Sequence, residues 1–394
     1  MGAAAAGWAV FVVANAQRID VVPFFNDLRP YYHVAYAGVG ALLSAYLLGY
    51  LLAQIPMGLA ADNLPTRRVT LAGLLLITLT SAAFAFTRAY WLAMGLRFLM
   101  GVSGAALYSS TVKQMLGATS RRGTAMGVLQ SGAGAGMIVG LFVLPLAGQF
   151  TSVQTAFLGM AAASCLALGV AAAGLPPSAP RRSGGDSLRQ QVGGVARQRQ
   201  FRYLSGCTFL ALFGAYGLVG WIPTYLRSGF GYGTAAAGAI ASLINIALTV
   251  ASPVAGTLSD RLRQRGTVIL VGFGTLGLAF ALLVAAHSPL GIGISAAVAG
   301  VGLALTLPII TTMTTEVFSV ERAGVAVALN LTVGQVASTV SGVLFGFLLD
   351  ATGSFRLMWG VGLVVVLAGF VPAWGLRRVE LAAAAARDRG GVYP

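Results

Sequence analysis

Long apolar segments separated by short polar stretches make up most of the chain. A helix needs about 20 apolar residues to cross a bilayer, and twelve segments reach that length. The pattern therefore predicts an all-α membrane protein whose twelve transmembrane helices form two groups of six. The expected helices span residues 4–26, 35–60, 68–87, 90–113, 123–148, 153–174, 203–227, 234–259, 267–286, 289–315, 323–350 and 354–376.

The longest polar stretch, residues 175–202, separates the sixth and seventh apolar segments. It contains two adjacent prolines, a Ser-Gly-Gly sequence and six arginines, which is typical of a linker. We expect its end, residues 187–202, to form a short surface helix. The predicted domains are an N-terminal six-helix bundle (1–174), the linker (175–202), a C-terminal six-helix bundle (203–376) and a tail (377–394).

A short motif occurs twice, 198 positions apart, where an apolar segment ends. The first copy runs from Gly58 to Asp62 and the second from Gly256 to Asp260, and arginines follow each copy. The sequence around Arg122 also recurs 200 positions later. Internal repetition of this kind indicates that the two halves share one architecture.

Composition supports a membrane protein and argues against other classes. The chain is 57% hydrophobic and 9% charged, whereas soluble domains contain about 25% charged residues. The net charge of +15 does not indicate nucleic-acid binding, because the basic residues lie between apolar runs and not beside aromatic residues. Cys165 and Cys207 lie in apolar segments without metal-ligand spacing, so we expect packed free thiols. His33 and His287 lie in separate loops; we expect neither an enzyme nor a cofactor.

The distribution of basic residues predicts the orientation of the chain. Nineteen lysines and arginines fall in the loops and tail on one side, against four on the other. Cytoplasmic loops hold the excess of basic residues, so both termini and the linker are expected in the cytoplasm, with the chain in the cell (inner) membrane. Residues 3–25 lack a basic start, so we expect a transmembrane helix there and not a cleaved signal.

Over essentially its whole length the chain resembles the major facilitator superfamily. The resemblance rests on the two Gly-x-x-x-Asp motifs with basic followers, the twelve spans and the central basic linker. It implies two six-helix bundles that rock about a site near the midplane, which opens alternately to each side. The first motif departs from the family pattern at Asn63, Pro65 and Thr66, so we expect its contacts to depend on Arg67 and Arg68.

The two motifs are candidate gates. A carboxylate at a helix end can pair with arginines or with helix N-termini of the opposite half, and release them when that side opens. The alternative is that these groups are solvated interfacial charges. The candidate gating residues are Gly58, Asp62, Arg67, Arg68, Gly256, Asp260 and Arg261.

Two arginines, Arg18 and Arg97, lie inside predicted spans. An arginine there costs at least about 2.5 kcal/mol, so each needs a cavity, a partner or a function. Both lie about eight residues from the predicted outer surface, roughly 12 Å deep, and paired guanidiniums at one level are suited to a carboxylate. Alternatively both are structural, since Arg97-x-x-x-Gly101-x-x-Gly104 matches a motif that is common in the family whatever the substrate.

Asp20 is the acid that lies clearly inside a span. It is two positions from Arg18, about 200° around a helix, so these two side chains cannot share a face. Asp20 either neutralises an arginine on a neighbouring helix, with Arg97 as the candidate, or carries a proton that is coupled to transport. Both alternatives remain open from the sequence.

Other polar side chains in apolar helices are candidates for a substrate cavity. Buried amides need a partner helix, water or a ligand, and tyrosines spaced by four residues line one helix face. The alternative for the tyrosines is packing. The candidate substrate-binding residues are Arg18, Arg97, Tyr46, Tyr50, Gln54, Gln130, Tyr216, Trp221, Asn245, Asn330 and Gln335.

Three local patterns help to distinguish among transporter branches. Segments around Gln17, from Gly38 to Asp62 and from Gly346 to Phe355 look similar to organic-anion symporter branches. Gly127, Gly136 and Gly140 lack the Gly-Pro pair common in drug antiporters and suggest close helix packing instead. We predict a monomeric secondary transporter of a small anion, with an organic carboxylate as the expected class, coupled to protons or acting by exchange. The alternative is a proton-coupled exporter of hydrophobic compounds.

Overall fold

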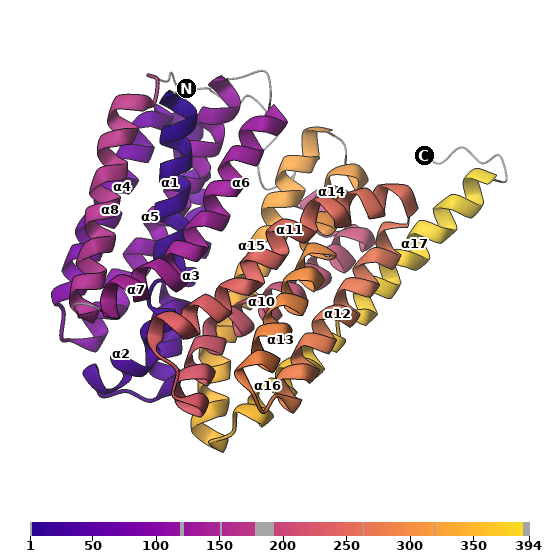
Figure 1. Cartoon of the computed structure of the whole chain (residues 1–394). Helices are drawn as coiled ribbons and strands as arrows, with labels where there is room; N and C mark the ends of the chain where they lie inside the picture. Colours follow the sequence, from indigo (N-terminus) through magenta and orange to yellow (C-terminus); the bar gives the residue numbers. More distant parts are fainter. Residues whose placement is uncertain are drawn as a thin grey trace. The chain divides into compact units, whose positions relative to one another are not determined.

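The computed structural model describes residues 2–118, 122–149, 152–177, 193–262, 264–318 and 320–388. Nearly all of these residues are helical (Figure 1), and they include twelve helical segments that are long and apolar enough to cross a membrane. The predicted fold class is therefore confirmed. Helix labels follow Figure 1.

The first six predicted spans correspond to helices in the N-terminal half, and the last six to helices in the C-terminal half. The N-terminal helices are α1 (Gly2–Ile19), η1 (Val22–Phe24), α2 (Phe25–Tyr31), α3 (Tyr36–Asn63), α4 (Thr66–Phe86), α5 (Tyr90–Ala118), α6 (Arg122–Ile138), η2 (Val139–Val143), α7 (Leu144–Gln149) and α8 (Val153–Gly174). The C-terminal helices are α10 (Arg199–Phe230), α11 (Thr234–Leu262), α12 (Arg265–Ala285), α13 (Pro289–Ala304), α14 (Leu307–Val317), α15 (Val320–Thr352), α16 (Phe355–Leu367) and α17 (Phe370–Asp388).

Three spans expected as single helices are interrupted, and the fifth contains a π-helical turn, η2, between α6 and α7. The first breaks after Ile19 and continues as η1 and α2, the tenth breaks between α13 and α14, and the twelfth breaks between α16 and α17. Pro23 and Pro308 lie just after the first two breaks. Proline has no N–H and cannot complete the preceding helical turn, which explains why the chain departs from a continuous helix at both places.

The described chain divides into two compact units. Unit 1 contains Met1–Gly184 together with Val219–Ser242 and Gly342–Gly353; unit 2 contains Gly185–Leu218, Leu243–Ser341 and Ser354–Pro394. Unit 1 therefore includes one end of α10, α11 and α15 beside the N-terminal helices. Most of the predicted surface helix at 187–202 lies outside the described residues, although 193–196 form a helical turn. Residues 377–388, predicted as a tail, continue α17.

Helices α3 and α5 of unit 1 approach each other closely because glycines lie at their contact. A Cβ atom at Gly49 would overlap the backbone carbonyl of Phe98, and one at Gly101 would overlap that of Tyr46. Lipid tails are as apolar as the helices, so the hydrophobic effect does not drive transmembrane helices together. Their association depends on close packing of this kind. The contact fixes α5, and with it Arg97, against α3.

We expect Gly49→Ala and Gly101→Ala to destabilise the protein by about 3 kcal/mol or more, because in each case a rigid backbone must move away from the added methyl group. Thermal unfolding in detergent measures the effect. Gly95→Ala on α5 is the matched control, since nothing lies within 4 Å of a Cβ atom there. Equal midpoints for Gly95→Ala and Gly101→Ala would contradict this account of the packing.

Helices α1 and α6 use glycines in the same way. A Cβ atom at Gly136 would meet the carbonyl oxygen of Val12, and one at Gly140 would meet that of Ala16. The prediction of close packing is thus confirmed for these two glycines. It is wrong for Gly127, which has open space beside it.

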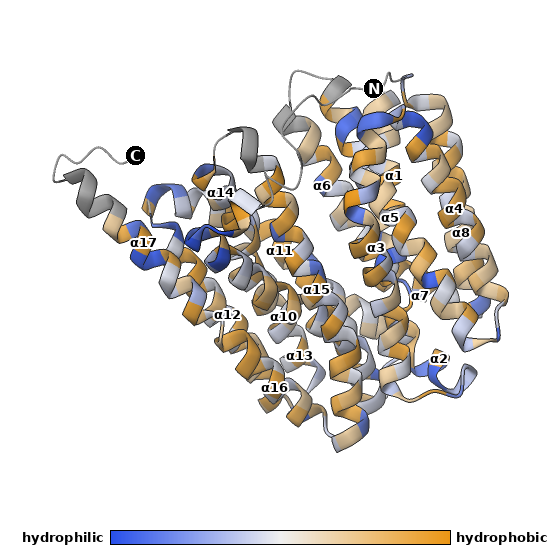
Figure 2. Ribbon diagram, turned by 180° about the vertical axis from the view of Figure 1, so that it is seen from behind, coloured by the Kyte–Doolittle hydropathy of each residue, from blue (hydrophilic) through white to orange (hydrophobic). Residues whose placement is uncertain are grey.

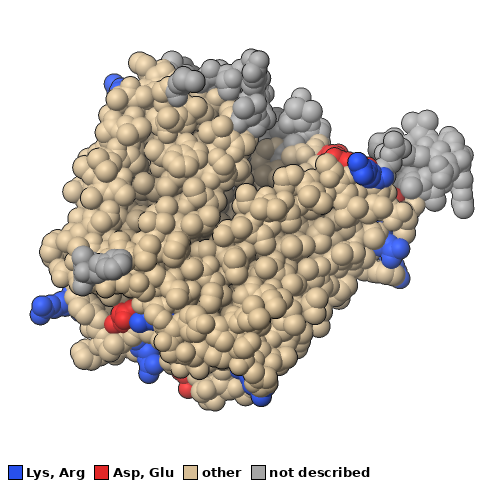
Figure 3. Space-filling view, viewed as in Figure 1, with Lys and Arg blue, Asp and Glu red and all other residues tan. Residues whose placement is uncertain are grey.

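The outer surface of the helices is apolar, as lipid contact requires. Trp91, Leu166 and Val250 are 80%, 72% and 70% exposed, and apolar residues cover the middle of most helices in Figure 2. The charged side chains visible in Figure 3 lie around the margin of the view and leave a broad uncharged surface between them. Both cysteines are free; Cys207 is buried as expected, but Cys165 is exposed on this surface.

Candidate functional site

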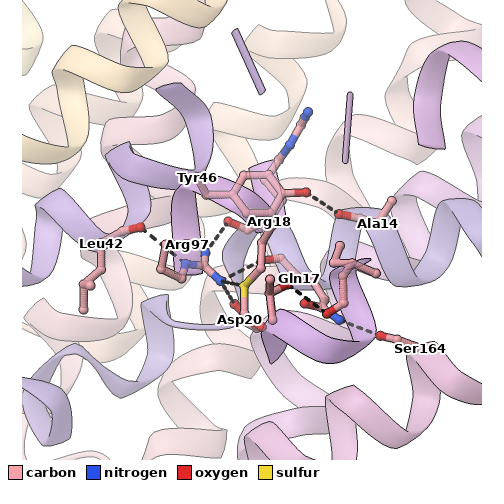
Figure 4. Close-up of polar contacts among 11 residues, drawn as sticks. Ala14, Gln17, Arg18, Asp20, Leu42, Tyr46, Arg97 and Ser164 are labelled. Atoms are coloured by element: carbon pink, nitrogen blue, oxygen red, sulfur yellow. Dashed lines mark hydrogen bonds and ion pairs between the residues drawn. The ribbon is translucent and has the colours of Figure 1, made fainter. Parts of the chain in front are cut away.

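Arg97 of α5 caps the end of α1, at the break in the first span (Figure 4). The last carbonyl groups of a helix have no partner within it. The Arg97 guanidinium donates to the carbonyl oxygens of Gln17 (3.0 Å) and Arg18 (3.3 Å). A cation at a helix C-terminus also interacts favourably with the helix dipole. Arg97 therefore stabilises the turn that begins after Ile19.

The same guanidinium forms a buried ion pair with Asp20. Its Nη1 lies 2.7 Å from the Asp20 Oδ1, and the two side chains are 0% and 1% exposed. Its Nε donates to the carbonyl oxygen of Leu42 on α3 (3.3 Å). The pair thus connects α1, α3 and α5. Arg97 has no exposed surface, and these acceptors occupy its guanidinium, which favours the structural alternative.

Arg18 differs from Arg97 because its side chain is only half-buried. Its guanidinium carbon lies 4.5 Å from the centre of the Tyr50 ring. Tyr46 lies one turn earlier on α3, with its ring centre 5.1 Å from the guanidinium carbon of Arg97. The Tyr46 hydroxyl donates to the carbonyl oxygen of Ala14 (3.1 Å). Each cation over an aromatic ring contributes about 0.5 to 2 kcal/mol. The tyrosine pair on α3 therefore holds both arginines in place.

Three other candidate residues of unit 1 have different surroundings. Gln54 is half-buried, and its buried Oε1 has no hydrogen-bond partner in the described part of the chain. Gln130 is exposed on α6. Trp221 is fully buried and packs against the rings of Phe25 and Tyr36, with centroid distances of 5.5 and 6.2 Å. Gln54 thus fits a binding role, whereas Trp221 fits the packing alternative.

The candidate residues of unit 2 are all buried. Tyr216, Asn245, Asn330 and Gln335 are each at most 9% exposed. Among the described residues, no partner exists for the Asn245 Nδ2, the Asn330 Oδ1 or the Gln335 Oε1. A buried polar atom without a partner costs about 1 to 3 kcal/mol, so a water molecule or a ligand is expected at each amide. These three amides remain candidates for substrate contact.

The first Gly-x-x-x-Asp motif pairs with a residue that the sequence analysis did not select. The Lys113 Nζ, on α5, lies 2.6 Å from the Asp62 Oδ1 and donates to the carbonyl oxygen of Gly58 (2.7 Å). Arg67 donates to the carbonyl oxygen of Ala172, and Arg68 is exposed. Lys113 reaches the motif because α5 packs beside α3, and the expected dependence on Arg67 and Arg68 stays a prediction. Lys113 is the chain's single lysine, a signal that sequence analysis could have used.

The second motif belongs to a larger charge network in unit 2. The Arg265 Nη2 lies 3.3 Å from Asp260 and 2.6 Å from Glu316. Glu380 of α17 accepts from the backbone N–H groups of Arg265 and Gly266 at 2.8 and 2.9 Å, which caps α12. The other two predicted gating residues of this motif are Gly256, which has open space beside it, and Arg261, which is exposed.

At the other end of the spans, unit 1 contains a second set of polar contacts, which we call the α2 end. Arg227 of α10 binds both carboxylate oxygens of Asp27 on α2, at 2.5 and 2.9 Å. Asp350 of α15 accepts from the N–H groups of Tyr36 (2.9 Å) and Ala37 (2.7 Å), which caps α3. Sequence analysis missed both contacts. Asp27 and Arg227 are 200 positions apart, the same spacing at which the sequence around Arg122 recurs. Opposite charges at equivalent positions of the two halves could therefore have predicted this pair.

Tyrosines attach α2 to the connection between α4 and α5. Tyr31 and Tyr32 both donate to the carbonyl oxygen of Thr87, at 3.2 and 3.3 Å. Burial raises the pKa of the Tyr32 hydroxyl, so this group stays protonated and remains a donor. Tyr90 donates to the carbonyl oxygen of Gly38 (3.0 Å). These contacts hold α2 against the helices that contain Arg97 and Tyr46.

Twelve apolar spans, an internal repeat and charged groups inside the first bundle define a multi-pass helical membrane transporter. The chain belongs to the major facilitator superfamily: the model of the Major Facilitator Superfamily matches residues 4–249 and 204–391. This membership confirms the family resemblance and the transporter class.

The chain is also similar to named transporters and to a solved structure. The chain is 26% identical to "Probable anion transporter 3, chloroplastic" of Oryza sativa subsp. japonica, over 87% of this chain and 73% of that protein. It is 25% identical to the "Cis,cis-muconate transport protein" of Acinetobacter baylyi, over 88% and 87%. A bacterial homologue of the human lysosomal transporter Spinster, solved in an inward-facing and unoccupied conformation, matches with a TM-score of 0.72 and 15% identity, over 98% and 95%. That structural match shows the fold.

Proposed function

We propose that this protein is a secondary active transporter that moves a small organic carboxylate across the cell membrane by alternating access, either with protons or by exchange. The observation that supports this most directly is the balance of charge at the end of α1. Asp20 compensates Arg97 in a buried pair, whereas Arg18 is half-buried beside Tyr50. The three groups together have one excess positive charge.

The chemistry of Arg18 suits a carboxylate. A guanidinium presents two parallel N–H donors that match the two carboxylate oxygens. The neighbouring Tyr50 provides an apolar ring face. Relatives whose names refer to anions and to cis,cis-muconate add support for this substrate class.

The exporter of hydrophobic compounds receives less support. Such a transporter would be expected to present an acid without accompanying arginines. Here the Asp20 Oδ1 lies 2.7 Å from Arg97 and the pair is buried. Arg18, which lies inside the same span as Asp20 but outside this pair, gives the span an excess of positive charge, which favours anions.

The polar contacts at the two ends of the spans are suited to gating. We propose that Asp62 and Asp260 act with their basic partners at the cytoplasmic end. The α2 end would then close the outer side, through Asp27 with Arg227 and through Asp350 at the start of α3. Charged contacts of this kind exist in one state of a transporter and separate in the other, so they bias the equilibrium between states.

A stabilisation screen of the purified protein tests the proposed function. We expect carboxylates, including cis,cis-muconate, to raise the thermal midpoint in a dose-dependent way, since a ligand at 100 times its Kd adds about 2.7 kcal/mol. Inorganic anions and cationic drugs form the comparison panels. Stabilisation by cationic drugs alone, with no response to any carboxylate, would contradict the proposal and return the exporter to first place.

A further inference from the structure

The α2 end contains a hollow of about 510 Å³, a volume in the range of small-molecule sites. Residues of α2, of its connection to α3 and of α10 line it, and all belong to unit 1. No acid is among the described lining residues. The lining consists of Asn26, Arg29, Pro30, His33, Val34, Tyr36 and Ser228.

His33 has an unusual backbone conformation in this hollow. Helix α2 ends in a turn in which the N–H of His33 donates to the carbonyl of Pro30 and that of Val34 to the carbonyl of Arg29. The residue at this position of such a turn takes a left-handed conformation and is usually glycine. His33 has φ of 53°, and it is the one non-glycine residue with positive φ in the described chain. Strained residues of this kind concentrate where a side chain is needed for binding.

Arg29 is oriented by its neighbour across the hollow. Its guanidinium carbon lies 4.1 Å from the centre of the Tyr36 ring. Both nearby acids have other partners, because Asp27 binds Arg227 and Asp350 binds the backbone of α3. Arg29 and His33 thus face the hollow together, and both are exposed.

Asn26 and Ser228 form the polar edge on the α10 side. The Asn26 Nδ2 donates to the Ser228 Oγ at 2.9 Å, so the two residues form one hydrogen-bonded unit. The Ser228 hydroxyl retains its own proton as a donor. A guanidinium, an imidazole and a hydroxyl around one hollow are the groups that bind a small oxyanion.

We propose that this hollow is a second anion site, which binds the carboxylate of the transported solute at the α2 end before the solute reaches Arg18. This inference rests on the proposed function. It gives a role to the α2 end that gating does not require, because Arg29 and His33 take no part in the contacts of Asp27 or Asp350. A site of this kind concentrates an anionic solute beside the gate and raises its rate of capture.

Titration of cis,cis-muconate into the Arg18→Ala variant isolates this site from the central one. We expect weak residual binding that falls at least tenfold in affinity when Arg29→Gln or His33→Gly is added. Arg356→Gln is the matched control: Arg356 is also exposed and lies beside a histidine, His287 (2.9 Å), but belongs to unit 2. It should leave the residual binding unchanged.

His33→Gly separates a binding role from a structural one. Glycine suits the left-handed conformation better than histidine, so the thermal midpoint should hold or rise while anion affinity falls. Transport by Arg29→Gln should show a KM raised about tenfold with kcat unchanged. Unchanged affinity in both variants, or stabilisation by phosphatidylglycerol in place of the carboxylate, would overturn the second site.

The outcomes also separate this inference from the proposed function. Tight binding by the wild type with no residual binding in Arg18→Ala would remove the second site and leave the central site in place. No carboxylate binding by the wild type would remove both. Residual binding that survives Arg29→Gln and His33→Gly would place the second anion elsewhere.

Discussion

Arg18→Ala should lower carboxylate affinity at least 100-fold while the folded protein remains in the membrane. Hydrogen bonds to charged groups contribute about 1.5 to 3 kcal/mol each, and each 1.4 kcal/mol is a factor of ten in Kd. Loss of a two-pronged contact therefore removes about 3 kcal/mol. The buried pair of Asp20 and Arg97 does not include the Arg18 side chain, so folding should survive. Equilibrium binding of labelled carboxylate to the purified protein measures the effect.

Two further variants sharpen this experiment. Arg18→Lys keeps the charge but lacks the planar pair of donors, so it should restore affinity only in part. Arg88→Ala removes an exposed arginine from the same half of the chain and should leave affinity unchanged. Undiminished binding by Arg18→Ala would contradict an anion site at Arg18, and full rescue by lysine would reduce the contact to simple charge attraction.

The sequence predicted the spans well because apolar length is a direct physical requirement of the bilayer. It did not predict the breaks. The first span ends early because Asp20 and Pro23 follow α1, and the turn is stable only because Arg97 satisfies the carbonyls of Gln17 and Arg18. That compensation comes from a residue nearly 80 positions away in the chain, which a local pattern cannot reveal.

The candidate site was predictable in part for a similar reason. Charges inside apolar segments are costly, so Arg18, Asp20 and Arg97 stood out. Which arginine faces Asp20 depends on the turn after Ile19, and that geometry favours the structural alternative for Arg97. Lys113 and Asp27 were overlooked because charges at span ends look like ordinary loop residues until their partners are known.

Asp20→Asn should destabilise the protein by about 3 to 5 kcal/mol, because it leaves the Arg97 charge buried without compensation. Adding Arg97→Gln removes that charge and keeps an amide that can donate to the α1 carbonyls, so most of the stability should return. Thermal midpoints of the wild type, the two single variants and the double variant form a complete double-mutant cycle. Asp27→Asn is the matched control: it makes the same change in the more exposed pair with Arg227 (34% and 16% exposed), where the cost should be about 1 kcal/mol.

The double variant also distinguishes the two alternatives for Asp20. If the Asp20 side chain serves mainly to compensate Arg97, the double variant should exchange a labelled carboxylate substrate. It should also still accumulate that substrate when a pH gradient is applied to proteoliposomes. We expect this result, because the pair is buried and connects α1, α3 and α5. Exchange without accumulation would instead assign the coupled proton to Asp20. A double variant as unstable as Asp20→Asn alone would show that the Arg97 charge is not what makes the single variant unstable.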